Sequence, residues 1–171
     1  MSDADRTRWE EKYAAGSHRD EAPVPFVAEA LADAPRGRAL DVACGCGRHA
    51  IVLADLGYEV DAVDISPLAL ECARERAGSR AIRFLELDLD VADLEEHAYH
   101  AVISVDFSSP TLAPRLVSAL APGGVLVHVA RPHALCRFGP RPDAILAWYA
   151  PLETLIHQED AGRVSYAGRL G

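Results

Sequence analysis

Short apolar segments alternate with longer segments of helical periodicity along most of this chain. The short segments are rich in Val, Ile, Leu and Ala, which is typical of strands buried inside a sheet. The alternation predicts an α/β fold in which a mostly parallel sheet carries helices on both faces. The predicted strands are residues 39–43, 58–63, 81–87, 99–105 and 125–130, and the predicted helices between them are residues 48–56, 67–77 and 112–120.

Turn-forming residues stand at the ends of these predicted elements. Gly57 follows the first helix as a C-cap. Ser66 is a good N-cap for the second helix, and Pro67 suits its first turn. The glycine-rich residues 122–124 predict a turn before the fifth strand. These positions agree with the boundaries that the apolar pattern indicates.

Both ends of the chain depart from this alternation. Near the N-terminus, Trp9 and Tyr13 are four residues apart, which places them on one face of a short helix. Residues 26–34 predict a second helix. Beyond Arg131, residues 145–149 predict a short helix. Two strands, 152–157 and 163–170, are joined by the polar residues 158–162, and this pair is expected to form an antiparallel hairpin on the sheet edge.

The composition is that of an ordinary globular protein. The chain has 171 residues, half of them apolar and a quarter of them charged, which suits one domain spanning residues 1–171. No apolar run approaches the roughly 18 residues that cross a bilayer, and the polar N-terminus does not resemble a signal peptide. We therefore expect no membrane partner. The protein is expected to be a monomer or a homodimer.

Charge and cysteine content narrow the expected partners and location. The net charge is −9, and a nucleic-acid partner usually calls for a basic surface, so we expect no nucleic acid as substrate. The four cysteines do not form a disulfide framework in a chain of this length without a secretion signal. Reduced thiols and a cytoplasmic location are expected.

The strongest candidate for chemistry is the segment from Ala39 to Arg48, in which Gly45 and Gly47 lie between a strand and a helix. Glycine permits positive φ and close approach of a ligand, and the following helix N-terminus offers N–H groups to an anion. Asp41 is a carboxylate within an otherwise apolar strand, and a buried acid is costly unless it is paired. A cationic ligand amine would pair with it. The alternatives are a plain strand-to-helix turn and an acid that caps its own loop.

Two further acids follow strands of the predicted sheet. Asp64 ends the second strand, and in an open α/β sheet ligands bind at the carboxyl ends of the strands. A carboxylate there accepts both hydroxyl protons of a ribose. Its alternative role, as N-cap of the helix at Pro67, is already filled by Ser66. Asp88 follows the third strand and is a candidate for an adenine amino group, with Leu89 packing on the ring.

A nicotinamide dinucleotide is the competing ligand. Residues 45–50 fit the G-x-G-x-x-A pattern, and Asp64 lies near the expected distance. Asp41 opposes this interpretation, because it would repel a pyrophosphate held by the loop.

Taken together, these residues resemble the class I S-adenosylmethionine-dependent methyltransferase family. In that family the first strand ends in an acid followed by a G-x-G loop, which here are Asp41, Gly45 and Gly47. Asp64 matches the acid of the second strand and Asp88 the acid after the third. The turn at residues 120–124 is another frequent family feature, and the likeness covers roughly residues 39–130. Trp9, Tyr13, Pro25-Phe26 and residues 44–48 are also similar to small bacterial methyltransferases of the tellurite-resistance and thiopurine type.

The resemblance implies a Rossmann-like fold whose seven-stranded sheet has the order 3-2-1-4-5-7-6, with the last strand antiparallel. It implies an enzyme that moves the methyl group of S-adenosylmethionine to a small-molecule acceptor. Residues 1–36 would form a helical cap, 37–130 the cofactor-binding core and 131–171 an edge hairpin. The cofactor-binding residues would be Asp41, Ala43, Cys44, Gly45, Gly47, Arg48, Asp64, Ile65, Asp88, Leu89 and Val105.

The acceptor site is less well marked. Residues 105–110 lack the Asn/Asp-Pro-Pro-Tyr signature of enzymes that methylate amino groups on nucleic acids. Ala43 replaces the first glycine of the loop, which matters little if its φ is negative. Arg131 and Arg137 are candidates for an anionic substrate, although solvated arginines are the default. The candidate substrate residues are Trp9, Tyr13 and Phe26, as a lid or a packing helix, together with Asp106 and His133.

Catalytic residues and metal ligands are not indicated. Cys44, Cys46 and His49 cluster in sequence, but no fourth ligand has a clear spacing, and we expect no metal. His133 is a candidate general base. Methyl transfer to a nucleophilic acceptor needs mainly orientation, so a dedicated base is not required. An NAD(P)-dependent oxidoreductase and a non-catalytic protein that binds S-adenosylmethionine remain the alternatives.

Overall fold

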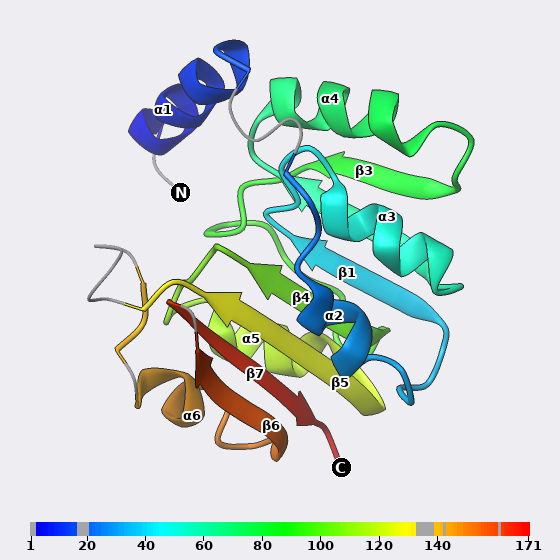
Figure 1. Ribbon diagram of the computed structural model, residues 1–171, viewed down its shortest axis with the longest axis vertical. Coiled ribbons are helices and arrows are strands. Elements are labelled where there is room, and N and C mark those ends of the chain that lie inside the picture. Colours follow the sequence, from blue (N-terminus) through cyan, green and yellow to red (C-terminus); the bar gives the residue numbers. More distant parts are fainter. Residues whose placement is uncertain (1–2, 17–20, 133–138, 142, 161) are drawn as a thin grey trace.

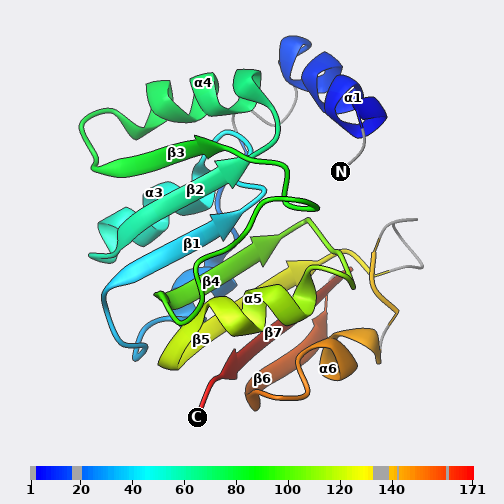
Figure 2. The same ribbon diagram turned by 180° about the vertical axis from the view of Figure 1, so that it is seen from behind.

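The computed structural model describes residues 3–16, 21–132, 139–141, 143–160 and 162–171. Its centre is a seven-stranded sheet of order β3-β2-β1-β4-β5-β7-β6 (Figures 1 and 2). All neighbouring pairs from β3 to β5 are parallel, and β7 runs antiparallel to both β5 and β6. The predicted fold class and strand order are confirmed. The strands are β1 (Arg38–Val42), β2 (Glu59–Asp64), β3 (Ile82–Glu86), β4 (Tyr99–Val105), β5 (Leu120–Ala130), β6 (Glu153–Asp160) and β7 (Arg163–Arg169).

Five of the six helices in the described part of the chain cover the two faces of the sheet. α2 (Pro25–Ala30), α3 (Arg48–Asp55) and α4 (Pro67–Ala77) lie on one face, and α5 (Ala113–Ala119) and α6 (Ala144–Trp148) lie on the other (Figures 1 and 2). The sixth, α1 (Asp3–Ala14), contacts α4 and stands at the carboxyl ends of the strands (Figure 1). None of these helices is long and apolar enough to cross a membrane.

The core consists of two apolar layers, one on each side of the sheet. Successive strand residues point to opposite faces, so Ala39 packs with Leu53 of α3, whereas Leu40 packs in the layer of Leu116 from α5. These four side chains are inaccessible to water or nearly so. Burying a leucine side chain contributes roughly 1.5–3 kcal/mol, so these layers fix the helices against the sheet.

Three element boundaries differ most from the predicted ones, two in strands and one in a helix. Residues 122–124 form a bulge within β5 instead of a turn before it, because Gly123 takes φ +74° and donates to the Leu170 carbonyl. The polar residues 158–160 belong to β6, which is an exposed edge strand and therefore needs no apolar pattern. α2 ends at Ala30, four residues earlier than predicted, and the turn of residues 31–33 follows it.

The order of the strands determines where a ligand can bind. From β1 the chain continues to β2 and β3 on one side, and then to β4 and β5 on the other. β1 and β4 are nevertheless paired, with Val42 opposite Ser104. Ligands of open α/β sheets bind at the carboxyl ends of strands at such a switch point. Residues 43–48 and 105–109 leave the sheet there. The predicted subdivision into residues 1–36, 37–130 and 131–171 stays a prediction.

Candidate functional site

A pocket of about 470 Å³ opens at the switch point between β1 and β4. This volume is in the range of small-molecule and cofactor sites. Its walls are the loop after β1, the end of β2, the segment after β4 and the inner face of α1. Most of the predicted cofactor residues line it: Asp41, Ala43, Cys44, Gly45, Arg48, Asp64, Ile65 and Val105.

The loop after β1 is built from residues with left-handed backbone conformations. Ala43 has φ +55°, Gly45 has φ +54° and Gly47 has φ +74°. The condition under which the replacement would matter little, a negative φ at Ala43, is not met, and this alanine occupies a conformation that favours glycine. Gly47 is also required for close packing, because a Cβ there would lie 3.0 Å from the Cβ of Ala73 in α4.

Substitutions at Ala43 are expected to report this backbone strain. Left-handed φ costs an L-residue roughly 1–2 kcal/mol, and a β-branched side chain is the least tolerated. We expect Ala43→Val to lower the free energy of unfolding by about 2 kcal/mol. Ala43→Gly should leave it within about 1 kcal/mol, because relief of strain offsets the greater entropy of the unfolded chain. Urea unfolding of both variants measures this, and equal stabilities would contradict the assigned conformation.

Asp64 fastens the loop to the end of β2. One carboxylate oxygen accepts a hydrogen bond from the Gly45 N–H at 2.8 Å, and the other accepts from the Ser66 N–H at 2.9 Å. Burial raises the pKa of Asp64, although these backbone N–H groups oppose the rise. Ser66 is the N-cap of α4, as predicted, and accepts from the Ala69 N–H. The sequence did not indicate that Asp64 binds the loop itself.

Asp41 has the most unusual environment of the pocket residues. Its side chain is only 2% exposed, and one oxygen, Oδ2, is buried without a hydrogen-bond partner. The other side of the carboxylate faces the Ala50 N–H in the first turn of α3. Burial raises the pKa of Asp41 to about 8, and this N–H lowers it only in part. The group therefore accepts from α3 on one side and, among the described residues, leaves Oδ2 without a hydrogen-bond partner on the other. Its pairing with a ligand amine stays a prediction.

The aromatic face of α1 covers this loop. Trp9 and Tyr13 line the pocket and stack on each other, with ring centroids 6.0 Å apart. A Cβ added at Gly45 would lie 2.8 Å from the Tyr13 hydroxyl oxygen, which shows how closely the ring approaches the loop. Burial, and secondarily the charge of Asp64, raise the pKa of Tyr13. Phe26 belongs elsewhere: it is 6% exposed and packs in the core layer beneath α2.

The segment after β3 is placed differently from the prediction. Asp88 is partly buried and accepts a hydrogen bond from the Asp90 N–H at 3.0 Å. Leu89 is fully buried in the core layer under α5, so its side chain does not face the pocket. Of these three residues, Asp90 lines the pocket. A contact of Asp88 with an adenine ring stays a prediction.

Asp106 is the centre of an ionic cluster at the pocket mouth. It follows β4 with φ +57°, and its carboxylate accepts from Arg48 of α3 and from Arg163 of β7, each at 2.8 Å. Arg131, after β5, lies 3.8 Å away, and Arg48 also pairs with Glu21. Burial would raise the pKa of Asp106, but the guanidinium groups of Arg163 and Arg48 outweigh it and keep the pKa low. His133 and Arg137 lie outside the described residues.

The candidate metal cluster has other functions in the structure. His49 accepts a hydrogen bond from the Val24 N–H at 3.0 Å, which ties the chain before α2 to α3. Burial lowers the pKa of His49 to about 3, so the ring is neutral and acts as an acceptor. Cys44 and Cys46 are buried and form no disulfide within the described part of the chain. Within the described part of the chain, no group of three His, Cys, Asp or Glu side chains is arranged to hold a metal ion.

A hydrogen-bonded line of three side chains reaches the pocket from the opposite core layer. Ser108, which lines the pocket, lies 3.1 Å from His128 Nε2, and His128 Nδ1 lies 2.8 Å from the Tyr149 hydroxyl. The segment that carries Ser108 is held by the Ser104 hydroxyl, which donates to the Phe107 carbonyl. The sequence placed His128 in a strand near the pocket, but nothing in it indicated the partners, which are 20 and 21 residues away.

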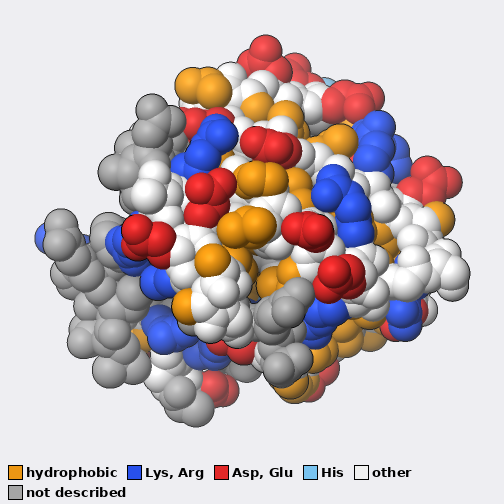
Figure 3. Space-filling view, turned by 90° about the horizontal axis from the view of Figure 1, so that it is seen from above, with side chains coloured by type: hydrophobic (Ala, Val, Ile, Leu, Met, Phe, Trp, Pro, Cys, Tyr) orange, Lys and Arg blue, Asp and Glu red, His pale blue; other side chains and the backbone are white. Residues whose placement is uncertain are grey.

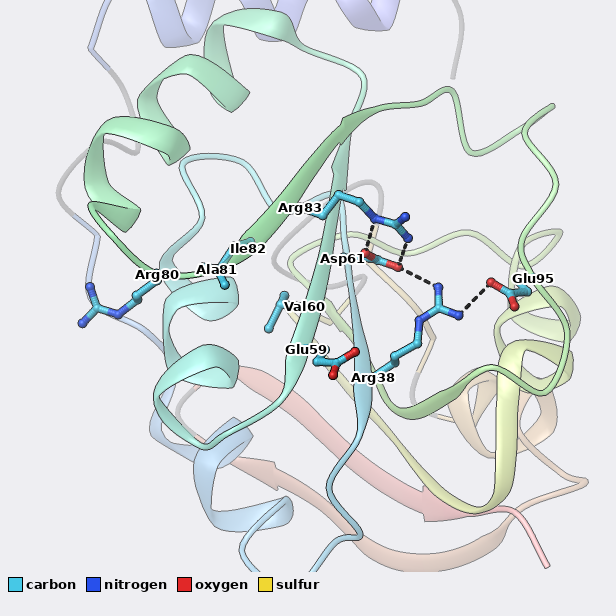
Figure 4. A pocket seen from close by; sticks show the side chains of 9 residues that line it. All are labelled: Arg38, Glu59, Val60, Asp61, Arg80, Ala81, Ile82, Arg83 and Glu95. Atoms are coloured by element: carbon cyan, nitrogen blue, oxygen red, sulfur yellow. Dashed lines mark hydrogen bonds and ion pairs between the residues drawn. The ribbon is translucent and has the colours of Figure 1, made fainter.

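A second, open depression lies at the other end of β1 and β2, and its charges are paired internally. Asp61 accepts from Arg83 at 2.6 Å and from Arg38 at 3.0 Å, and Arg38 also pairs with Glu95 at 2.8 Å (Figure 4). Tyr99 donates a further hydrogen bond to Asp61 at 2.9 Å. Because Asp61, Arg38, Arg83 and Glu95 each face an opposite charge, these side chains stabilise the sheet.

Comparison with known proteins assigns the family. A family model described as a methyltransferase domain matches residues 39–124, half of the chain. The chain belongs to this family. The class I S-adenosylmethionine-dependent methyltransferase family and its cofactor, both expected from the sequence, are confirmed. The nicotinamide alternative is thereby set aside.

Curated relatives match this methyltransferase domain over part of their length. The ribosomal protein L11 methyltransferase of Bordetella parapertussis is 34% identical over 142 residues, covering 80% of this chain and 44% of the relative. The protein-L-isoaspartate O-methyltransferase of a Synechococcus species is 32% identical over 109 residues, covering 61% and 43%. The chain spans less than half the length of these relatives.

Solved structures share the fold across nearly the whole chain. The N-methyltransferase NodS of Bradyrhizobium japonicum, in complex with S-adenosylhomocysteine, has a TM-score of 0.81 at 19% identity and covers 96% of this chain and 97% of its own. TehB of Haemophilus influenzae has a TM-score of 0.76 at 20% identity, covering 95% and 67%. At these identities the likeness shows the fold.

The pocket residues fit the charged part of the cofactor. The unpartnered Asp41 oxygen matches a cationic amine, and the turn before α3 presents backbone N–H groups to a carboxylate. S-adenosylmethionine carries both groups on one amino-acid moiety. When bound, it supplies an electrophilic methyl group.

Proposed function

We propose that this chain transfers the methyl group of S-adenosylmethionine to a small-molecule acceptor. The observation that carries the proposal is one continuous pocket, which joins the buried Asp41 carboxylate to the segment after β4 beneath the aromatic face of α1. In this proposal Asp41 binds the amino group of the cofactor and Asp64 the ribose hydroxyls. Asp64 already accepts from the N–H groups of Gly45, Ser66 and Ile65, but its two oxygens offer about four lone-pair sites.

The remaining residues would orient the acceptor. Val105 and Asp106 line the pocket opposite the loop after β1, and Trp9 and Tyr13 close it from α1. Such an enclosure excludes water and fixes the angle of attack, which accounts for most of the rate enhancement when the acceptor is already nucleophilic. A general base is therefore not required. Because Trp9 and Tyr13 cover this part of the pocket, it favours a small molecule over a protein.

The test is methyl transfer from labelled S-adenosylmethionine to a panel of small thiols, phenols and amines, with a cell-protein fraction in parallel. We expect S-adenosylhomocysteine to form with at least one small molecule. Labelling of protein alone would overturn the small-molecule acceptor. Binding of the cofactor without transfer to any acceptor would support the non-catalytic alternative.

Asp64→Ala is expected to weaken S-adenosylhomocysteine binding by about tenfold or more and to destabilise the fold by about 2 kcal/mol. Both effects follow from the loss of a buried acceptor of two loop N–H groups. Ser66→Ala is the matched control, because it removes the α4 cap and should cost only about 1 kcal/mol with unchanged affinity. Calorimetric titration and urea unfolding measure both. An affinity of Asp64→Ala equal to that of the wild type would disprove the role of Asp64 in cofactor binding.

The remaining expectations on partners and location are proposals of the same kind. On the face seen in Figure 3, Lys and Arg side chains stand beside Asp and Glu side chains, so the described residues there show no continuous basic surface for nucleic acid. The cytoplasmic location and the monomeric or dimeric state stay predictions from the sequence.

A further inference from the structure

The ionic cluster at the pocket mouth has one positive charge in excess. Three guanidinium groups, from Arg48, Arg131 and Arg163, face two carboxylates, from Asp106 and Glu21. Arg48 and Arg163 occupy the Asp106 carboxylate at 2.8 Å. Arg131 reaches it only at 3.8 Å, beyond hydrogen-bond distance, and has no other partner among the described residues.

Arg131 is placed to bind a ligand and not merely to be solvated. It lines the pocket directly after β5, and its side chain is 53% exposed. The excess charge contrasts with the net charge of −9 of the whole chain. The positive charge is local to Arg131, because the other charged side chains that line the pocket include the carboxylates of Asp41, Asp64 and Asp90. The half-exposed and loosely paired Arg131 guanidinium is therefore suited to an anionic group.

The line from Ser108 to Tyr149 supplies a hydrogen-bond donor at the same mouth. The Tyr149 residue is 1% exposed, and among the described residues its hydroxyl has one partner, His128 Nδ1. A buried O–H left without an acceptor would cost about 1–3 kcal/mol, so Tyr149 donates to Nδ1. A neutral imidazole that accepts at Nδ1 carries its proton on Nε2. His128 therefore donates to the Ser108 oxygen.

This arrangement determines the direction of the Ser108 hydroxyl. Because its oxygen accepts from His128, its own proton is free to be donated into the pocket that it lines. Burial lowers the pKa of His128 to about 4, so the ring stays neutral at pH 7 and the direction of donation is preserved. Ser108 thus selects for a group with lone pairs.

Ser108 and Arg131 lie on neighbouring strand ends. They follow β4 and β5, which pair through Val105 and Val129, and the Asp106 N–H donates to the Val129 carbonyl at 2.8 Å. Ser108 offers a directed O–H, and Arg131 offers a guanidinium charge. A carboxylate accepts both kinds of hydrogen bond, and charge-assisted bonds of this kind are about twice as strong as neutral ones.

We propose that the methyl acceptor carries a carboxylate, which Arg131 and Ser108 bind at the pocket mouth. The carboxylate is a recognition group, and the atom that receives the methyl group is elsewhere on the molecule. This inference rests on the proposed function, since it names the substrate class of the same pocket. His128 and Tyr149 are positioning residues that act through Ser108.

The test compares acids with their amides, which differ in charge but hardly in size. The probes are 3-mercaptopropionate, 4-hydroxybenzoate and 4-aminobenzoate, each paired with its primary amide, titrated into protein saturated with S-adenosylhomocysteine. We expect at least one acid to bind about tenfold more tightly than its amide. Arg131→Gln should abolish this preference, and Arg131→Lys should retain part of it. Ser108→Ala should weaken the acid several-fold and the amide less.

Arg74→Gln is the matched control. It removes the same charge from an exposed position on α4 that does not line the pocket, so the preference should be unchanged. If S-adenosylhomocysteine binds but no acid binds more tightly than its amide, the proposal of a carboxylate on the acceptor is overturned and the proposed function stands. If Arg131→Gln keeps the preference, the assignment of Arg131 is overturned. Failure of S-adenosylhomocysteine to bind overturns both proposals.

Discussion

Asp41→Asn is expected to weaken binding of S-adenosylhomocysteine by about 100-fold, or roughly 2.7 kcal/mol. The Asp41 carboxyl group faces the pocket with its Oδ2, and it can ionise to pair with a cationic amine, which an amide of the same shape cannot do. The variant keeps an oxygen for the Ala50 N–H, so α3 should remain capped. Calorimetric titration measures the affinity. A loss of less than about threefold would contradict the role of Asp41.

The same substitution is expected to change how stability depends on pH. The pKa of Asp41 is about 8 when folded, against an ordinary value of 3.8. The folded state therefore holds one more proton between these pH values, and this contribution to stability is lost as pH rises from about 4 to about 8. Between pH 6 and pH 8, wild type should lose about 2 kcal/mol more than Asp41→Asn. His49 and His128 are common to both proteins, so their opposite contribution cancels in the comparison.

Asp61→Asn is expected to lower the stability of the fold without changing the affinity for S-adenosylhomocysteine. Asp61 is 5% exposed and accepts hydrogen bonds from Arg38 and Arg83 (Figure 4). It also accepts one from Tyr99. Burial alone would raise its pKa, but Arg83, Arg38 and Tyr99 together hold it below the ordinary range. An uncharged amide satisfies these donors poorly, so the variant should be about 2–3 kcal/mol less stable. Because this cluster lies at the other end of the strands, affinity for S-adenosylhomocysteine should not change.

Glu95→Gln is the control for this cluster. Its side chain is 63% exposed and pairs with Arg38 at 2.8 Å, and exposed ion pairs contribute less than about 1 kcal/mol. Urea unfolding should therefore show a large effect at Asp61 and a small one at Glu95. Equal effects would contradict the view that Asp61 anchors β1, β2 and β3.

The sequence was sufficient to predict the sheet and the loop after β1. Apolar periodicity reports the burial of each segment, and the alternation of segments predicts a mostly parallel sheet. The strand order was implied by the resemblance to the methyltransferase family. The position of Asp41, Gly45 and Gly47 between a strand and a helix follows from short-range pattern alone. These features depend on neighbours in the chain, which a sequence displays directly.

The features that the sequence did not predict depend on pairs that are distant along the chain. The hydrogen bond from Gly45 to Asp64 joins residues 19 apart, and Asp106 meets Arg163 across 57 residues. Such pairs are decided by strand order and register, not by local composition. The sequence left Phe26 with two roles, lid or packing, because an aromatic side chain has the same one-dimensional signal in a core and in a pocket. Its burial in the core layer favours packing.

The most direct test of the proposed cofactor site is calorimetric titration of the wild type at pH 7 with S-adenosylhomocysteine and with NAD, in buffers of different ionisation enthalpy. Because the folded Asp41 has a pKa of about 8 and must ionise to pair with the ligand amine, binding of S-adenosylhomocysteine should release about one proton. Asp41→Asn should release none. Micromolar binding of NAD alone, or binding of S-adenosylhomocysteine with the same proton release in both proteins, would contradict the assignment.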